Sequence, residues 1–125
     1  MTVMKLHKLL YYAQAWTLVW DEKPLFCQKI EAWANGPVVR EVYALHRGKF
    51  EVSSWEKGHA DALTPRQQRH IKSVLKFYGD KTAQWLSDLT HREKPWLEAR
   101  RGLAPLARGS REITTAAMHE YYSSI

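Results

Sequence analysis

The clearest periodic stretch of the chain covers residues 3–20. One face of this segment is apolar at positions three and four residues apart, namely Leu6, Leu9, Leu10, Ala13, Trp16 and Trp20. The opposite face is apolar as well, through Tyr11, Ala15, Leu18 and Val19. This spacing predicts an α-helix, and a helix that is apolar on two sides is usually buried between neighbours. We therefore expect residues 3–20 to form the central helix of the fold.

The following segment has no helical period. Ile30, Ala32 and Ala34 alternate with Glu31, Trp33 and Asn35, which predicts a short strand near residues 30–34. Gly36 and Pro37 then indicate the start of a helix over 37–47, because proline is favoured at the first helical position. Gly48 is expected to end that helix. Residues 49–63 predict a polar loop that carries Trp55.

A complete helix start signal stands at Thr64. Thr64 is a good N-cap, Pro65 follows it, and Gln67 three residues later completes a capping box. The pattern predicts a helix over 64–79, with an apolar face made of Ile71, Val74, Leu75 and Tyr78. The opposite face is basic and consists of Arg66, Arg69, Lys72 and Lys76, with Phe77 near its edge.

The last third of the chain predicts three shorter helices and a small β element. Asp80 is a suitable cap for a helix to about Thr90, with Trp85, Leu86 and Leu89 facing inward. A short helix over 95–101, a loop over 102–110, a strand at 112–113 and a final helix over 114–123 follow. The expected fold is mainly α, a compact single-domain helical bundle of about five to six helices with a small β element, covering residues 1–125.

Composition supports a folded, cytoplasmic protein. The chain is 45% hydrophobic, with six Trp and six Tyr, enough to build a core. The apolar run Leu9–Trp20 is interrupted by polar side chains and is too short to span a bilayer, so we expect neither a signal peptide nor membrane insertion. The single cysteine, Cys27, suits a reducing compartment.

No residue pattern points to a reaction centre. The six histidines are scattered along the chain, and zinc needs three or four converging ligands, so no metal is expected. Cys27 is more readily interpreted as a small buried hydrophobe than as a nucleophile. Neither glycine-rich nucleotide-binding pattern is present. These observations predict a binding protein that is not an enzyme and needs no cofactor.

The positive charge leaves nucleic acid open as a partner. The net charge is +6, and most of it falls in residues 64–125, which hold eleven Lys or Arg against six Asp or Glu. The basic face of helix 64–79 could bind phosphates, extended by Arg92, Lys94, Arg100, Arg101, Arg108 and Arg111. A solvated helix face explains the same pattern, and no helix-turn-helix signature accompanies it.

Three stretches together resemble a known family. They are KLHKLLYYAQAW at residues 5–16, EAWANGPVV at 31–39 continuing to Arg47 and Gly48, and LSDLTHREKPW at 86–96. Their order and spacing resemble the Panacea domain of the SocA-like antitoxins of bacteria and phages. The segment from Ile113 to Tyr122 is similar to that family's last helix.

The resemblance implies a type II antitoxin that neutralises a cognate toxin by direct protein–protein binding, with the toxin encoded next door. It leaves open a proteolytic adaptor that delivers a toxin to an ATP-dependent cellular protease. A basic nucleic-acid-binding regulator, or an enzyme that reverses a toxin's modification, are further alternatives.

Two sets of candidate residues follow. Interface hot spots are enriched in aromatic side chains and arginine, so the predicted toxin-binding residues are Arg47, Trp55, Arg66, Arg69, Phe77 and Arg92. The motif residues are interpreted as structural and are Trp33, Asn35, Gly36, Pro37, His91, Pro95 and Trp96. In this interpretation Asn35 tolerates left-handed or cap geometry, Gly36 allows close approach, and His91 is a buried polar residue hydrogen-bonded to backbone.

Overall fold

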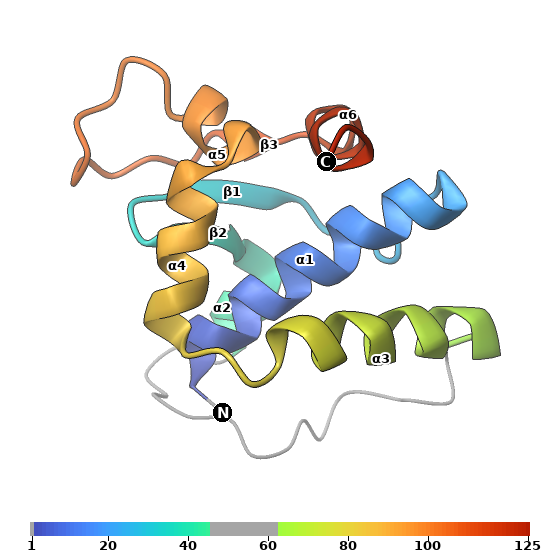
Figure 1. Cartoon of the computed structure of the whole chain (residues 1–125). Coiled ribbons are helices and arrows are strands. Elements are labelled where there is room, and N and C mark those ends of the chain that lie inside the picture. Colours follow the sequence, from blue (N-terminus) through green and yellow to red (C-terminus); the bar gives the residue numbers. More distant parts are fainter. Residues whose placement is uncertain (1, 46–62) are drawn as a thin grey trace.

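The computed structural model describes residues 2–45 and 63–125 (Figure 1). The elements are, in chain order, α1 (Val3–Asp21), β1 (Ile30–Trp33), β2 (Gly36–Val39), α2 (Arg40–Leu45), α3 (Pro65–Tyr78), α4 (Ala83–Arg92), α5 (Lys94–Ala99), β3 (Glu112–Ile113) and α6 (Thr115–Ser123). The predicted fold class is confirmed, because this part of the chain is mainly helical with one small sheet. Arg47, Trp55 and nearly all of the predicted loop over 49–63 lie outside the described residues.

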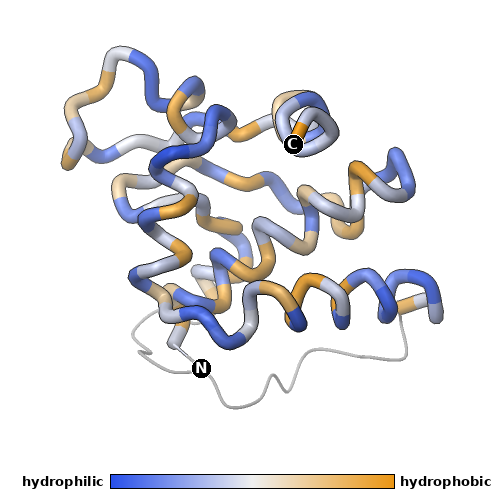
Figure 2. Tube along the Cα trace, viewed as in Figure 1, coloured by the Kyte–Doolittle hydropathy of each residue, from blue (hydrophilic) through white to orange (hydrophobic). Residues whose placement is uncertain are grey.

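The central position predicted for the first helix is confirmed. Helix α1 lies between α3 and α6 and also packs against β2 (Figure 1). Tyr11, Tyr12 and Ala15 are fully buried. Figure 2 shows hydrophobic and hydrophilic positions intermingled along α1. Thr2 caps its start by accepting a hydrogen bond from the backbone N–H of Lys5. The periodicity predicted Trp20, near the end of α1, as part of the buried face, but its side chain is 40% exposed.

The sheet corrects the prediction for residues 36–39. They form strand β2, which pairs antiparallel with β1 in the order β2-β1-β3, and the following helix begins only at Arg40. Proline at position 37 is tolerated opposite Ala32, and the β-branched pair Val38 and Val39 is buried in the strand. The prediction of a helix starting at Pro37 was wrong because pairing with a distant strand outweighed a local start signal.

The turn between β1 and β2 places the left-handed residue at Gly36. Its φ is +122°, whereas Asn35 does not have a positive φ, so the left-handed geometry considered for Asn35 does not occur. A β-carbon at position 36 would lie 2.5 Å from Cε of Lys8, which makes glycine necessary for the close approach of the turn to α1.

The capping box at the start of α3 is confirmed, since Thr64 and Gln67 each bond the other's backbone N–H. Val74 and Tyr78 are buried, but Leu75 is 42% exposed and does not belong to the core face. The next helix, α4, is capped by Thr82 and not by Asp80, because Gly79 and Asp80 form the turn.

The inward direction predicted for Trp85 was also wrong. Trp85 is 39% exposed, and the ammonium of Lys81 lies 5.2 Å from the centre of its ring. Of the three residues predicted to face inward, only Leu86 is fully buried. The strand at 112–113 appears as predicted, and the final helix, predicted over 114–123, spans Thr115–Ser123 with Thr114 as its N-cap.

Candidate interaction surface

The turn between β1 and β2 is held by side chains from the other end of the chain. Four donors in and after helices α4 and α5 each meet one backbone carbonyl of the turn: Ser87 that of Asn35 at 2.7 Å, His91 that of Ala34 at 2.8 Å, Trp96 that of Trp33 at 2.8 Å, and Arg100 that of Ala32 at 3.0 Å. The donors follow the helices while the acceptors run in the reverse order along the hairpin. This series, which we call the hairpin clamp, fixes the turn against α4 and α5.

His91 is the most constrained member of the hairpin clamp. Its Nε2 meets the carbonyl of Ala34, and its Nδ1 lies 2.5 Å from the carbonyl of Ser87. Both ring nitrogens thus face backbone carbonyls, one in α4 and one in the hairpin. The Trp96 ring packs on the imidazole at 4.0 Å between centroids, and Pro95 beside it is buried in the first turn of α5.

Lys8 is a buried cation beneath the same turn. It is 1% exposed, and its Nζ lies 3.4 Å from the carbonyl of Pro37. Burial lowers the pKa of Lys8 to about 8. The sequence pattern missed this residue, because a lysine on a helix is normally assigned to a solvated face.

A second buried polar group joins α1, α6 and the end of α4. Glu93 is 6% exposed and accepts hydrogen bonds from the hydroxyls of Tyr12 at 2.5 Å and Tyr122 at 2.9 Å. The Tyr122 and Tyr11 hydroxyls are 3.0 Å apart, and Tyr12 stacks on Tyr78 with centroids 4.2 Å apart. Burial raises the pKa of Glu93. Sequence reasoning missed this cluster, although Glu93 stands inside the quoted LSDLTHREKPW motif.

The four predicted toxin-binding residues within the described part of the chain lie on α3 and α4. On α3, Phe77 is 63% exposed and Arg69 is exposed beside the equally exposed Lys72 and Lys76. Arg66 is already engaged, because its Nε lies 2.6 Å from the carboxylate of Asp21. Arg92 is exposed at the end of α4, away from the start of α3 (Figure 1).

The contact between α1 and α3 involves Asp21. Its Oδ1 lies 3.0 Å from Nε2 of His70 and also contacts Arg66. These two hydrogen bonds lower the pKa of Asp21, and the bond with His70 has the larger effect. The His70 ring packs against Trp20 with centroids 4.9 Å apart. The exposed basic face that remains open on α3 therefore starts at Arg69 and not at Arg66.

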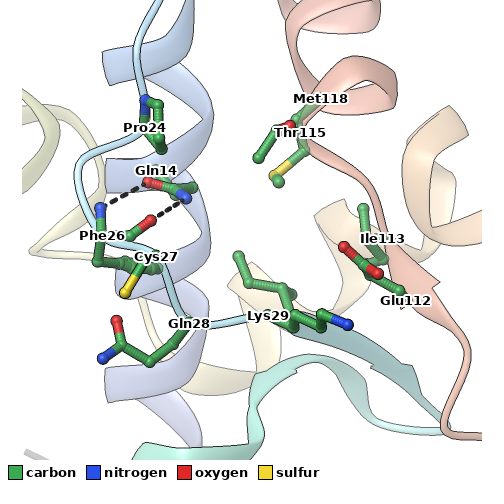
Figure 3. Close-up of a pocket in the computed structure, with 11 residues that line it drawn as sticks. Gln14, Pro24, Phe26, Cys27, Gln28, Lys29, Glu112, Ile113, Thr115 and Met118 are labelled. Atoms are coloured by element: carbon green, nitrogen blue, oxygen red, sulfur yellow. Dashed lines mark hydrogen bonds between the residues drawn. The ribbon is translucent and has the colours of Figure 1, made fainter.

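One small cavity lies between the α1–β1 connection and the start of α6 (Figure 3). It has a volume of about 250 Å³ and is mostly apolar, with Met118, Ile113 and Phe26 among its lining residues. The side chain of Gln14 is consumed by backbone bonds to Leu25 and Phe26. Cys27 at this cavity is exposed, so its prediction as a buried hydrophobe was wrong.

Within residues 2–45 and 63–125, no group of three His, Cys, Asp or Glu side chains could hold a metal ion. In the same part of the chain, no helix is both long and apolar enough to cross a membrane.

The described residues expose aromatic and cationic side chains, including Phe77 and Arg69, and such side chains are enriched at the hot spots of protein interfaces. The sequence matches the family model described as "Antitoxin SocA-like, Panacea domain" over residues 6–97. The chain therefore belongs to the SocA-like antitoxin family, which confirms the resemblance. Comparison with curated proteins and with solved structures found no match.

Proposed function

We propose that this protein is a cytoplasmic, non-enzymatic antitoxin that neutralises a cognate toxin by direct protein–protein binding. Its membership of the antitoxin family carries the proposal, since it implies a toxin partner and a regulatory role. The clamped hairpin and the buried polar clusters supply a rigid frame on which such a partner can be bound.

The exposed face of α3 is the proposed toxin contact. Phe77 offers a large exposed ring, and Arg69, Lys72 and Lys76 add positive charge on the same helix. Aromatic and arginine side chains contribute most at interface hot spots, and a basic face attracts an acidic partner at long range. Arg92 on α4 is a proposed additional contact, while the engagement of Arg66 with Asp21 reduces what Arg66 can contribute.

Coexpression with the neighbouring gene tests this function. We expect growth to be restored and a stoichiometric complex to elute in size-exclusion chromatography. Phe77→Asp should weaken that complex at least tenfold, whereas Leu75→Asp, a matched change at a 42% exposed position of the same helix, should not. Failure of the wild-type protein to restore growth would refute the antitoxin function, and equal effects of the two variants would refute the α3 contact.

The same experiment separates the proteolytic adaptor from the blocking antitoxin. A blocking antitoxin leaves the toxin's half-life unchanged or lengthens it, whereas an adaptor shortens it and needs an ATP-dependent protease. Growth restored together with rapid loss of toxin would replace the blocking mechanism.

The basic face of α3 supports nucleic-acid binding as a second candidate. Its exposed Arg69, Lys72 and Lys76 could neutralise phosphates. A gel-shift titration with operon DNA and an unrelated duplex checks this. If both duplexes were retarded equally and moderate salt released them, the binding would be non-specific and due to net charge alone.

A further inference from the structure

The connection between α5 and β3, residues 100–111, is an irregular loop that projects from the molecule on the side away from α3 (Figure 1). Connections in compact domains usually run to about 4–6 residues, and longer ones without secondary structure are commonly functional or disordered. This loop lies beyond residues 6–97, the part matched to the family. The match therefore assigns no role to this loop.

The loop is held in one conformation by Arg100. This side chain is only 5% exposed and donates to the carbonyls of Ala104 at 3.1 Å and Ala107 at 2.6 Å, while also reaching Ala32 on the sheet. Its guanidinium lies 5.4 Å from the centre of the Trp96 ring. Burying a charge is costly unless the charged group is hydrogen-bonded. The hydrogen bonds of Arg100 offset this cost and at the same time order the surface loop.

Further contacts close the loop at both ends. Gly109 is packed so tightly that a β-carbon there would lie 2.9 Å from Nη1 of Arg100. Arg111 donates from Nη1 to the carbonyl of Arg101 at 2.5 Å, and its own carbonyl accepts from the N–H of Ala32 at 2.8 Å. The loop is thus ordered before any partner arrives, which lowers the entropic cost of binding.

This ordered loop presents a leucine to solvent. Leu106 is 89% exposed, the highest value among the exposed large hydrophobic residues of the described chain. Exposed Arg101, Arg108 and Arg111 surround it in sequence, Arg101 being paired with Glu98, and residues 100–111 contain no acidic side chain. Packing within the domain does not explain this leucine, because almost none of its surface is covered.

We propose that the 100–111 loop is a preformed docking element that inserts Leu106 into an apolar pocket rimmed by carboxylates on the toxin. The proposal rests on the proposed antitoxin function and adds a second contact to the α3 face. Charge selects this occupant: a second copy of the chain, at net +6, would be repelled. An apolar pocket on a protein would cover the leucine, whereas contacts to phosphates alone would leave it exposed.

The test uses the full-length protein and the purified toxin encoded by the neighbouring gene. We expect Leu106→Asp and Arg108→Glu each to raise the dissociation constant at least tenfold, and the wild-type affinity to fall as salt is raised. Ile125→Asp, at a 66% exposed hydrophobic position, and Lys23→Glu, at an exposed cation outside the loop, are the matched controls and should change affinity less than twofold. Circular dichroism and the thermal midpoint of each variant should match the wild-type values.

The outcomes separate the two proposals. Wild-type complex formation with unchanged affinity in Leu106→Asp would overturn the docking element while leaving the antitoxin function intact. No wild-type complex would overturn both. Retained toxin binding in Leu106→Asp together with lost binding to a duplex DNA probe in Arg108→Glu would assign the loop to nucleic acid and also overturn the proposal.

Discussion

Replacing Lys8 by methionine should stabilise the protein at neutral pH. Lys8 is 1% exposed and has one weak bond, 3.4 Å long, to the carbonyl of Pro37. Methionine has a similar length without the charge, so it can fill the space beneath Gly36 while removing a desolvated ammonium. The perturbation therefore isolates the cost of burying this cation.

The magnitude follows from the pKa of Lys8, which burial lowers from 10.5 to about 8. At about 1.4 kcal/mol for each pKa unit, the charged form is disfavoured in the folded state by about 3 kcal/mol. Losing the bond to Pro37 costs about 1 kcal/mol, which leaves a net gain in the free energy of unfolding of about 2 kcal/mol at pH 7 for Lys8→Met.

The effect should depend on pH with a defined sign. Between pH 8 and 10.5 the unfolded chain binds a proton at Lys8 that the folded chain does not, so wild-type stability rises with pH through this window. Lys8→Met lacks that rise. The gain in the free energy of unfolding of the variant over wild type should therefore be largest at pH 7 and should shrink towards pH 10. Other titrating groups are shared by the two proteins, so their effects cancel in this difference.

Urea unfolding of both proteins at pH 7 and pH 10 checks this, with exposed Lys29→Met as a control that should leave stability unchanged. A variant that is less stable than wild type at pH 7, or a difference independent of pH, would refute the reasoning. In either case Lys8 would be contributing interactions that offset its desolvation.

Three further predictions concern the same frame. Gly36→Ala should destabilise the protein by about 2 kcal/mol or more, since φ is +122° and the new β-carbon would meet Lys8; thermal unfolding measures this. His91→Ala removes two hydrogen bonds to carbonyls and should cost about 2–3 kcal/mol in urea unfolding, with a loss within 0.5 kcal/mol of zero contradicting the hairpin clamp. Burial raises the pKa of Glu93 above its unfolded value of 4.5. The stability that Glu93 contributes to the fold is therefore fully present below pH 4.5 and is lost as the pH rises through the folded pKa. The free energy of unfolding of Glu93→Gln, relative to wild type, should therefore be higher at pH 7.5 than at pH 4.5. The opposite trend would exclude a desolvated carboxylate at Glu93.

The candidate site was predictable only in outline. Exposed Phe77 and Arg69 could be found because the hydrophobic period of α3 leaves them outside its buried face. The loop that presents Leu106 could be recognised as a loop from its Gly, Pro and Ser content. Its order could not, because Arg100, which bonds the loop carbonyls of Ala104 and Ala107, is itself anchored on the carbonyl of Ala32, a strand residue almost seventy positions earlier.

Local patterns determined most of the helices. The central helix, the capping box at Thr64 and the caps at Thr82 and Thr114 rest on residues three or four positions apart, so the information lies within one turn. Even here the N-cap of α4 was assigned to Asp80, because Asp80 and Thr82, two positions apart, are both suitable capping residues. The family resemblance likewise depended only on the order and spacing of short motifs, and the family match confirms it.

Only the tertiary structure decided which polar groups are buried and what the hairpin does. Residues 36–39 read locally as a helix start, yet β1 offered them backbone partners and they became a strand. Lys8, Glu93 and Arg100 would be solvated on isolated helices, and they are buried because the turn carbonyls and the tyrosine hydroxyls converge on them from distant segments. Such partners are brought together by packing, and no pattern within a few residues contains that information.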